Sequence, residues 1–288
     1  MAASPLEALS GPIQKLSLRA NTESGAIESI GGIPKLDGVT GYLEIDYDGQ
    51  TKRASGFAEI DTPFLRMNLP NIYTRDWSYD YVNGRIDFLS KFEAGLDLTL
   101  SSNTLIAESA TTTGRVQFTS QLVRPAEGEP QSNIELLIGL ERMLAEDRYY
   151  YLPDGPKIEQ GLKSTMAWVG GAALDGTFFD SGAILRGSML PGSDPAAKTF
   201  QSFYRLRDGT INYAEGWPEI EDVEAFVSTA DSVVDVFVTA GNSYGLLLDG
   251  AKGTVRPTVN EEGELRNRLV VEGGATGLTQ DALNFLSA

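Results

Sequence analysis

The residues from Phe200 to Val255 alternate apolar and polar side chains in short runs, and turn-forming residues interrupt these runs about every ten positions. Period-two alternation places every second side chain on the same side of an extended strand. A Trp217-Pro218 corner separates a hairpin pattern from an acidic strand pattern. The block therefore predicts consecutive antiparallel strands with no helical crossover between them.

The rest of the chain repeats this pattern, so we expect a mostly β fold. An Asp48-Gly49 pair favours a tight hairpin turn, because glycine tolerates positive φ. Helices are predicted at Glu141–Tyr151, at Pro156–Trp168 and from Thr279 onward. The chain thus divides into a β segment at residues 1–140, a helical insertion at 141–170, and a β segment at 171–288 that ends in a helix. Further strands are predicted at Lys15–Ala20, Val39–Tyr47, Arg53–Ile60, Phe64–Leu69, Tyr81–Leu89, Leu96–Leu100, Arg115–Leu122, Asn133–Leu140, Ala172–Phe179, Ala183–Ser188 and Leu265–Glu272.

The composition excludes most catalytic mechanisms and most kinds of metal site. The chain has 288 residues, with no histidine and no cysteine. Histidine-activated nucleophiles, most zinc and iron sites, thiol catalysis and disulfide scaffolds are therefore excluded. The formal charge is −17, from 40 acidic and 23 basic residues, which argues against nucleic acid as a partner because phosphate contacts need clustered Lys and Arg. We expect no enzymatic activity, no cofactor and no bound metal.

One short motif imitates a catalytic signature. Residues Gly241–Gly245 read GNSYG and match the G-x-S-x-G nucleophile elbow, but that elbow needs a strand–turn–helix context and a histidine base. A β pattern follows the motif instead, so Ser243 is predicted at a turn that enters a strand. Hydrolysis of a carbohydrate by a pair of carboxylates is the least favoured hypothesis. No feature selects one pair among Glu44/Asp46, Glu59/Asp61 and Asp175/Asp180.

What remains as a functional surface is a set of aliphatic side chains in period-two spacing. They would form one continuous stripe if their strands pair in order. If a second sheet covers the stripe, the stripe is the core of a β-sandwich, and composition alone favours this alternative. If nothing covers it, the stripe is an apolar trough that can hold lipid chains. A register slip of one residue would turn the stripe to the other face. The stripe consists of Leu16, Leu18, Leu43, Ile45, Leu96, Leu98, Leu100, Ile134, Leu136, Ile138, Val234, Val236 and Val238.

Several consecutive segments carry a resemblance to known proteins. They are FYRLRDGTINYAEGWP (Phe203–Pro218), VEAFV (Val223–Val227), SVVDVFV (Ser232–Val238) and YGLLLDGAKGTV (Tyr244–Val255). GLKSTMAWVGGAALDGTFFDSGAILRG before them and VVEGGATGLTQDALNFLSA after them share the likeness. Over roughly residues 80–288 the chain resembles the bacterial AsmA-like family, in particular its very large YhdP-type members. Residues 1–80 fit by β-strand pattern only.

Proteins of this family are similar to bridge-like lipid transfer proteins of the chorein type. The resemblance implies a long curved antiparallel sheet that forms an apolar groove, with a few short helices, in the periplasm. It implies a parent protein anchored in the inner membrane by an N-terminal helix, with partners at the inner and outer membranes. The implied activity is transport of glycerophospholipids between the two membranes.

Under this hypothesis the chain is a segment of such a protein without the anchor, and phospholipid acyl chains contact the stripe. The competing hypothesis is a β-sandwich module of the cell envelope that binds or scaffolds but transports no lipid.

Overall fold

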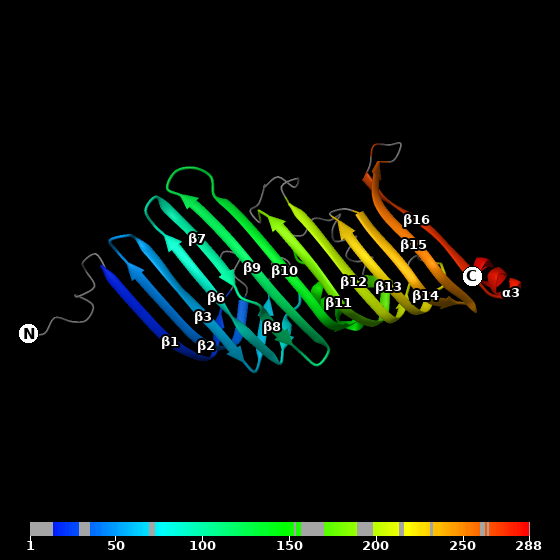
Figure 1. The fold of residues 1–288 in the computed structure, drawn as a ribbon, viewed down its shortest axis with the longest axis horizontal. Coiled ribbons are helices and arrows are strands. Elements are labelled where there is room, and N and C mark those ends of the chain that lie inside the picture. Colours follow the sequence, from blue (N-terminus) through cyan, green and yellow to red (C-terminus); the bar gives the residue numbers. More distant parts are fainter. Residues whose placement is uncertain are drawn as a thin grey trace, which may run out of the picture.

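One antiparallel sheet of sixteen strands makes up most of the molecule. A computed structural model describes residues 14–28, 35–68, 73–152, 154–156, 170–188, 198–212, 216–230, 233–259, 263 and 265–287. Strands that follow one another in the sequence are neighbours along most of the sheet, which extends from β1 at one end to β16 at the other (Figure 1). The mostly β, antiparallel fold is therefore confirmed.

Thirteen longer strands and three short ones form this sheet. The short strands β4 (Leu65–Asn68) and β8 (Leu105–Glu108) continue β3 and β7, and β5 (Trp77–Tyr79) precedes β6. The longer strands are β1 (Lys15–Ile27), β2 (Lys35–Asp48), β3 (Arg53–Thr62), β6 (Tyr81–Lys91), β7 (Gly95–Ser102), β9 (Thr112–Pro125), β10 (Gln131–Leu144), β11 (Ala173–Gly187), β12 (Thr199–Ile211), β13 (Ile220–Ala230), β14 (Val233–Ser243), β15 (Leu246–Val259) and β16 (Leu265–Thr276).

A line of bulges and strand breaks crosses the sheet and bends it. A bulge adds a residue to one strand, which bends that strand and increases its twist. Three aspartates on this line, Asp180, Asp208 and Asp222, have φ angles of 41°, 51° and 53°, a region that aspartate tolerates better than most residues. Below the line the strands curve under the sheet, which becomes a trough with a concave and a convex face (Figure 1). The interruptions lie at Thr22–Gly25, between β3 and β4, between β7 and β8, and at Leu140–Arg142, Phe179–Gly182, Leu206–Gly209, Glu221–Glu224 and Asp249–Lys252.

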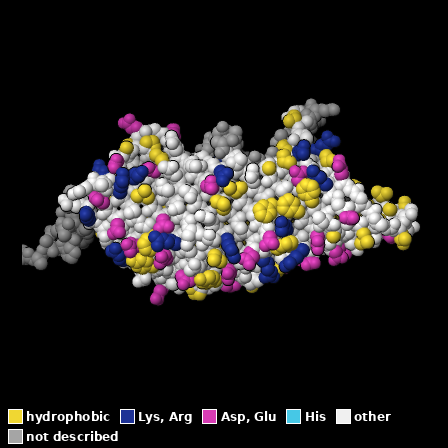
Figure 2. All heavy atoms as spheres, viewed as in Figure 1, with side chains coloured by type: hydrophobic (Ala, Val, Ile, Leu, Met, Phe, Trp, Pro, Cys, Tyr) yellow, Lys and Arg dark blue, Asp and Glu magenta, His cyan; other side chains and the backbone are white. Residues whose placement is uncertain are grey.

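The convex face is polar and carries cross-strand ion pairs. Arg19 lies 3.1 Å from Glu44, which it opposes in the β1–β2 ladder. Arg186 lies 2.8 Å from Glu135 in the β10–β11 ladder. Figure 2 shows acidic and basic side chains intermixed along the whole length of this face. Exposed pairs of this kind contribute little stability each, about 0.2–1 kcal/mol, but they keep the convex face wet.

A row of phenylalanines also stabilises the convex face. The ring centroids of Phe203 and Phe226 are 6.2 Å apart, and those of Phe226 and Phe237 are 6.4 Å apart. The Lys252 ammonium lies 5.1 Å from the centroid of Phe237. The Phe203 ring also covers Gly182 on the neighbouring strand. Such cross-strand contacts stabilise a sheet that has no covering layer on this side.

The tightest packing lies at the bend, on the concave face. One buried cluster contains Leu206, Val223, Ala225 and Val238, and Phe178 packs against it. A second buried cluster lies at the other end of the trough. It consists of Leu65, Tyr79 and Val82, with Leu36, Val39, Ile60, Met67, Trp77 and Ala107 packed around it. Bending brings the two sides of the trough together only near the bend, so burial is greatest there.

The helices differ from their predicted positions. The structure shows β10 as far as Leu144 where a helix was predicted from Glu141, followed by the short helices η2 (Ala145–Asp147) and α1 (Arg148–Tyr151). The helix predicted at Pro156–Trp168 lies outside the described residues beyond Pro156. The strand predicted at Asn133–Leu140 was four residues short of the end of β10, because the sheet's hydrogen bonds override the helical spacing of residues 141–144.

One other local prediction is corrected. The two strands predicted at Ala172–Phe179 and Ala183–Ser188 are one strand, β11, interrupted by the bulge at Asp180. The last helix is found where it was predicted: α3 spans Thr279–Ser287, and Asp281 accepts a hydrogen bond from the Leu278 backbone N–H at 3.0 Å.

A substitution at Gly56 tests how closely β2 and β3 approach each other in the curved sheet. A Cβ atom at Gly56 would lie 1.9 Å from the backbone oxygen of Glu44, so the two strands would have to separate. We expect Gly56→Ala to lower the free energy of unfolding by about 1–3 kcal/mol, measured by urea denaturation. Gly171→Ala is the matched control, because nothing lies within 4 Å of its added Cβ. Equal stability of the two variants would contradict the close approach of β2 and β3.

Candidate functional site

The strand registers place every residue of the predicted aliphatic stripe on the concave face. Residues directly opposite each other in an antiparallel ladder have side chains on the same face. Leu18 opposes Ile45, and the same row of the sheet passes through Leu100 to Ile134. A second row joins Val234 to this face through β11, β12 and β13. The other members, which share the face through the same ladders, are Leu16, Leu43, Leu96, Leu98, Leu136, Ile138, Val236 and Val238.

The same registers add apolar residues that the sequence analysis did not select. Their signal was present in the alternation of their own strands, but their face could be assigned only through their partners. Phe88, for example, opposes Leu100, and Leu185 opposes Leu136. The added residues are Tyr47, Phe88, Phe118, Leu122, Leu185, Phe200, Val255 and Leu269.

The stripe is open to its surroundings above the bend and closed at the bend. Leu18 keeps 45% of its surface exposed and Ile138 keeps 41%. Val238, in contrast, is 9% exposed and belongs to the buried cluster around Val223. Val238 therefore contributes mainly to the core, while the residues above the bend form a surface that a ligand can reach.

The concave face above the bend is almost free of formal charge. Among the described strand residues there, Arg124 at the upper end of β9, opposite Leu96, is the one with a charged side chain on this face. Some hydroxyls on the face are bonded within the protein: Ser202 and Thr229 are 2.7 Å apart, and Ser102 accepts a hydrogen bond from the Phe118 N–H. The buried hydroxyl of Ser90, which opposes Leu98, has no hydrogen-bond partner among the described residues. The surface is therefore suited to hydrocarbon rather than to charged or sugar groups.

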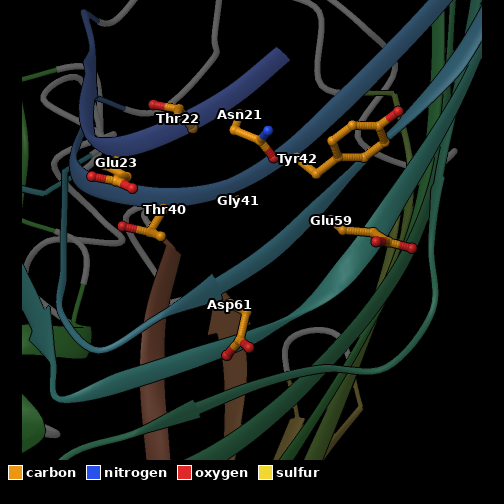
Figure 3. A pocket seen from close by; sticks show the side chains of 8 residues that line it. All are labelled: Asn21, Thr22, Glu23, Thr40, Gly41, Tyr42, Glu59 and Asp61. Carbon is orange, nitrogen blue, oxygen red and sulfur yellow. The ribbon is translucent and has the colours of Figure 1, made fainter. Parts of the chain in front are cut away.

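A polar hollow of about 410 Å³ lies over β1, β2 and β3, mainly on the convex side (Figure 3). Glu23, Glu59 and Asp61 line it together with Thr40 and Tyr42. The Tyr42 hydroxyl donates to Glu44, and this hydrogen bond raises the pKa of Tyr42. The lining is unsuited to an acyl chain, because it presents carboxylates and hydroxyls.

The carboxylate pairs considered for hydrolysis lie away from the concave face. Glu44 is bound by Arg19 and Glu59 by Arg85, both on the convex face. Among the described residues no group of three or more acidic side chains is arranged to hold a metal ion.

The GNSYG motif forms a hairpin turn between β14 and β15. Tyr244 and Gly245 have φ angles of 50° and 82°, and Ser243 ends β14. The Ser243 hydroxyl is buried and donates to the Glu219 carbonyl oxygen at 2.7 Å. Ser243 thus tethers the turn to the start of β13, as a strand-end residue and not as an exposed nucleophile.

Comparisons with protein-family models, curated proteins and solved structures found no match to this chain. None of the described helices has the length and apolar character needed to cross a bilayer.

Substituting leucines above and at the bend tests whether the concave face is open. Leu206→Gln places an amide at a position that is 4% exposed and should lower the free energy of unfolding by roughly 3–5 kcal/mol. Leu18→Gln, on the open part of the same face, should cost less than about 1 kcal/mol. Urea denaturation of both variants measures the difference. Similar large losses in both would show that the stripe above the bend is a closed core.

Proposed function

We propose that this chain is a periplasmic segment of a lipid transfer protein that carries glycerophospholipids between the inner and outer membranes along an apolar β-groove. The observation that supports this most is the concave face itself. It is apolar from β1 to β16, nearly uncharged above the bend, and half-exposed, and within the described residues no second sheet covers it.

The physical chemistry of acyl chains fits such a face. Each CH₂ group moved from water to an apolar surface gains about 0.8 kcal/mol. Thirteen strands succeed one another from β1 to β16, so at about 4.8 Å per strand spacing the groove is roughly 60 Å long. Half of a bilayer's hydrocarbon core is about 15 Å, so the groove exceeds the length of one acyl chain several-fold. Headgroups can stay in water at the upper rim while the chains lie against the stripe.

A smooth aliphatic surface also allows movement. Hydrophobic contact is non-directional, so a chain that shifts along the groove loses no specific bond. Hydrogen bonds that would have to break at each step are few on this face, because the stripe is aliphatic and the hydroxyls of Ser202 and Thr229 bond to each other. Transport along the groove therefore needs no nucleotide or metal at this segment.

The resemblance to the AsmA-like family supports the cellular part of the proposal. A parent protein of that kind is anchored in the inner membrane and meets partner proteins at both membranes. The segment described here supplies part of the path between them, and the acyl chains of phospholipids are its direct partners.

The competing hypothesis of a β-sandwich scaffold requires a second sheet over the apolar face. All strands of the described residues belong to one sheet, and its stripe residues above the bend are half-exposed. A lipid-binding groove explains both observations, whereas a closed sandwich explains neither.

Photo-crosslinking at adjacent residues on opposite faces tests the proposal. Leu98 lies on the concave face, and Thr99 beside it lies on the convex face. With a benzophenone amino acid at each position in turn, the purified chain is irradiated with radiolabelled glycerophospholipid in mixed micelles. We expect lipid captured at Leu98 at least about tenfold above Thr99, because the acyl chains lie on one face. Equal capture at the two positions, or none at Leu98, would overturn the groove as a lipid path.

A further inference from the structure

The curved sheet divides into two branches below the bend. One branch contains the start of β2, then β4 and then β5. Among the described residues, β5 pairs with β4 alone. The other branch continues through β8 and β9 to β10, from which the chain passes through η2 into α1. The free edge of β5 therefore faces α1 and not a further strand, and a seam separates the two branches.

Side chains hold this seam together. Thr74 donates its backbone N–H to the Asp154 carboxylate at 2.8 Å, and its hydroxyl donates to the same carboxylate. The hydrogen bonds from Thr74 hold the pKa of Asp154 below its usual value. The Trp77 indole N–H donates to the carbonyl oxygen of Tyr150. These contacts join residues more than seventy positions apart in the chain.

An arginine adds to the same seam. The Arg75 guanidinium donates to the carbonyl oxygen of Tyr149 at 2.8 Å and lies 5.7 Å from the centroid of the Tyr149 ring. On the α1 side, Arg148 fixes the helix, since its guanidinium donates to the carbonyl oxygens of Gly170 and Ala145. The α1 side of the seam is thus anchored, and the β5 side rests against it.

The inner side of the seam is aromatic and reaches the concave face. The Trp77 ring centroid is 4.6 Å from that of Tyr73 and 5.6 Å from that of Tyr151. Burial, and next the nearby phenol of Tyr204, raise the pKa of Tyr73 to about 12. Tyr204 lies on the concave face, in the same strand and on the same side as Leu206. Trp77 also packs against the same buried cluster as Ile60, which opposes Gly41 on the concave face. A molecule that passes between β5 and α1 therefore arrives in the apolar groove.

The seam also differs from the other junctions of the described sheet, because no ladder of backbone hydrogen bonds joins its two sides. Neighbouring strands of the described sheet are joined by ladders of backbone hydrogen bonds, whereas β5 and α1 are joined by side-chain contacts and aromatic rings, of which Tyr79 is buried. A junction without a backbone ladder opens without breaking the hydrogen bonds of a sheet. Indole and phenol rings suit a passage with one wet and one apolar side, because each combines an apolar body with a polar edge.

We propose that the seam between β5 and α1 is a lateral entrance through which phospholipid acyl chains reach the groove from its lower side. This inference rests on the proposed lipid-carrying function. Opening requires β5 to move away from α1, which breaks the Thr74–Asp154, Arg75–Tyr149 and Trp77–Tyr150 contacts and leaves the ladders from β6 to β16 intact.

Because the chain contains no cysteine, a pair of introduced cysteines allows the two sides of the seam to be crosslinked specifically. In the double variant Thr74→Cys/Asp154→Cys, a short bis-methanethiosulfonate crosslinker joins the two sides of the seam, and a reductant removes it. The measurement is the rate at which the protein takes up a fluorescent phospholipid from phosphatidylethanolamine vesicles. We expect the crosslink to slow uptake and reduction to restore it, because entry through the seam is blocked and only the open upper side of the groove remains.

The matched control is Arg19→Cys/Glu44→Cys, crosslinked in the same way across β1 and β2 on the convex face. Its uptake should not change with crosslinking. Unchanged uptake in the locked seam variant, or equal slowing in both variants, would overturn the entrance while leaving the groove intact as a lipid site. Absence of uptake by the uncrosslinked protein would instead overturn the proposed function itself, and the entrance with it.

Discussion

The main physical constraint on this molecule is that the apolar face of its sheet has no second sheet to pack against within the described residues. Two-layer β proteins bury that face between sheets. Here the backbone ladders from β1 to β16 carry most of the cohesion, and the line of bulges bends the sheet enough to shelter only part of its apolar face. Leu206 and Val223 are buried at the bend, whereas Leu18 above it is not.

Incomplete burial connects stability to function. An exposed apolar face of this extent is usually an interaction surface or an aggregation risk. Acyl chains that lie on the face would complete its burial, and a ligand that binds the folded chain stabilises it. The convex face has the opposite character, since its cross-strand ion pairs and intermixed charges keep it in water. The two faces of one sheet thus have separate roles, and the seam beside β5 offers a way from one side to the other.

Much of this arrangement was predictable, because it follows from period-two alternation. The positions of Leu16, Leu98 and Val236 within their strands were enough to predict that they share a face once the strands pair in order, and the registers pair them so. The bend was not predictable, because it depends on positive φ angles at residues such as Asp180 and Asp222, where a glycine would have been the visible signal. The same bulge made β11 look like two strands. The seam was hidden for another reason: its contacts join residues near 75 to residues near 150, and no local pattern reports a contact between them.

Native mass spectrometry of the chain, expressed in a Gram-negative host and purified in mild non-ionic detergent, would show whether the concave face holds acyl chains. A lipid groove predicts adducts with the masses of glycerophospholipids, and predicts that Leu98→Glu together with Leu136→Glu removes most of them, because both carboxylates would lie on the apolar face. The convex-face pair Thr99→Glu and Gln117→Glu should leave the adducts in place. A lipid-free mass for the unmodified chain, or adducts that persist in the concave-face variant, would contradict a lipid-carrying groove.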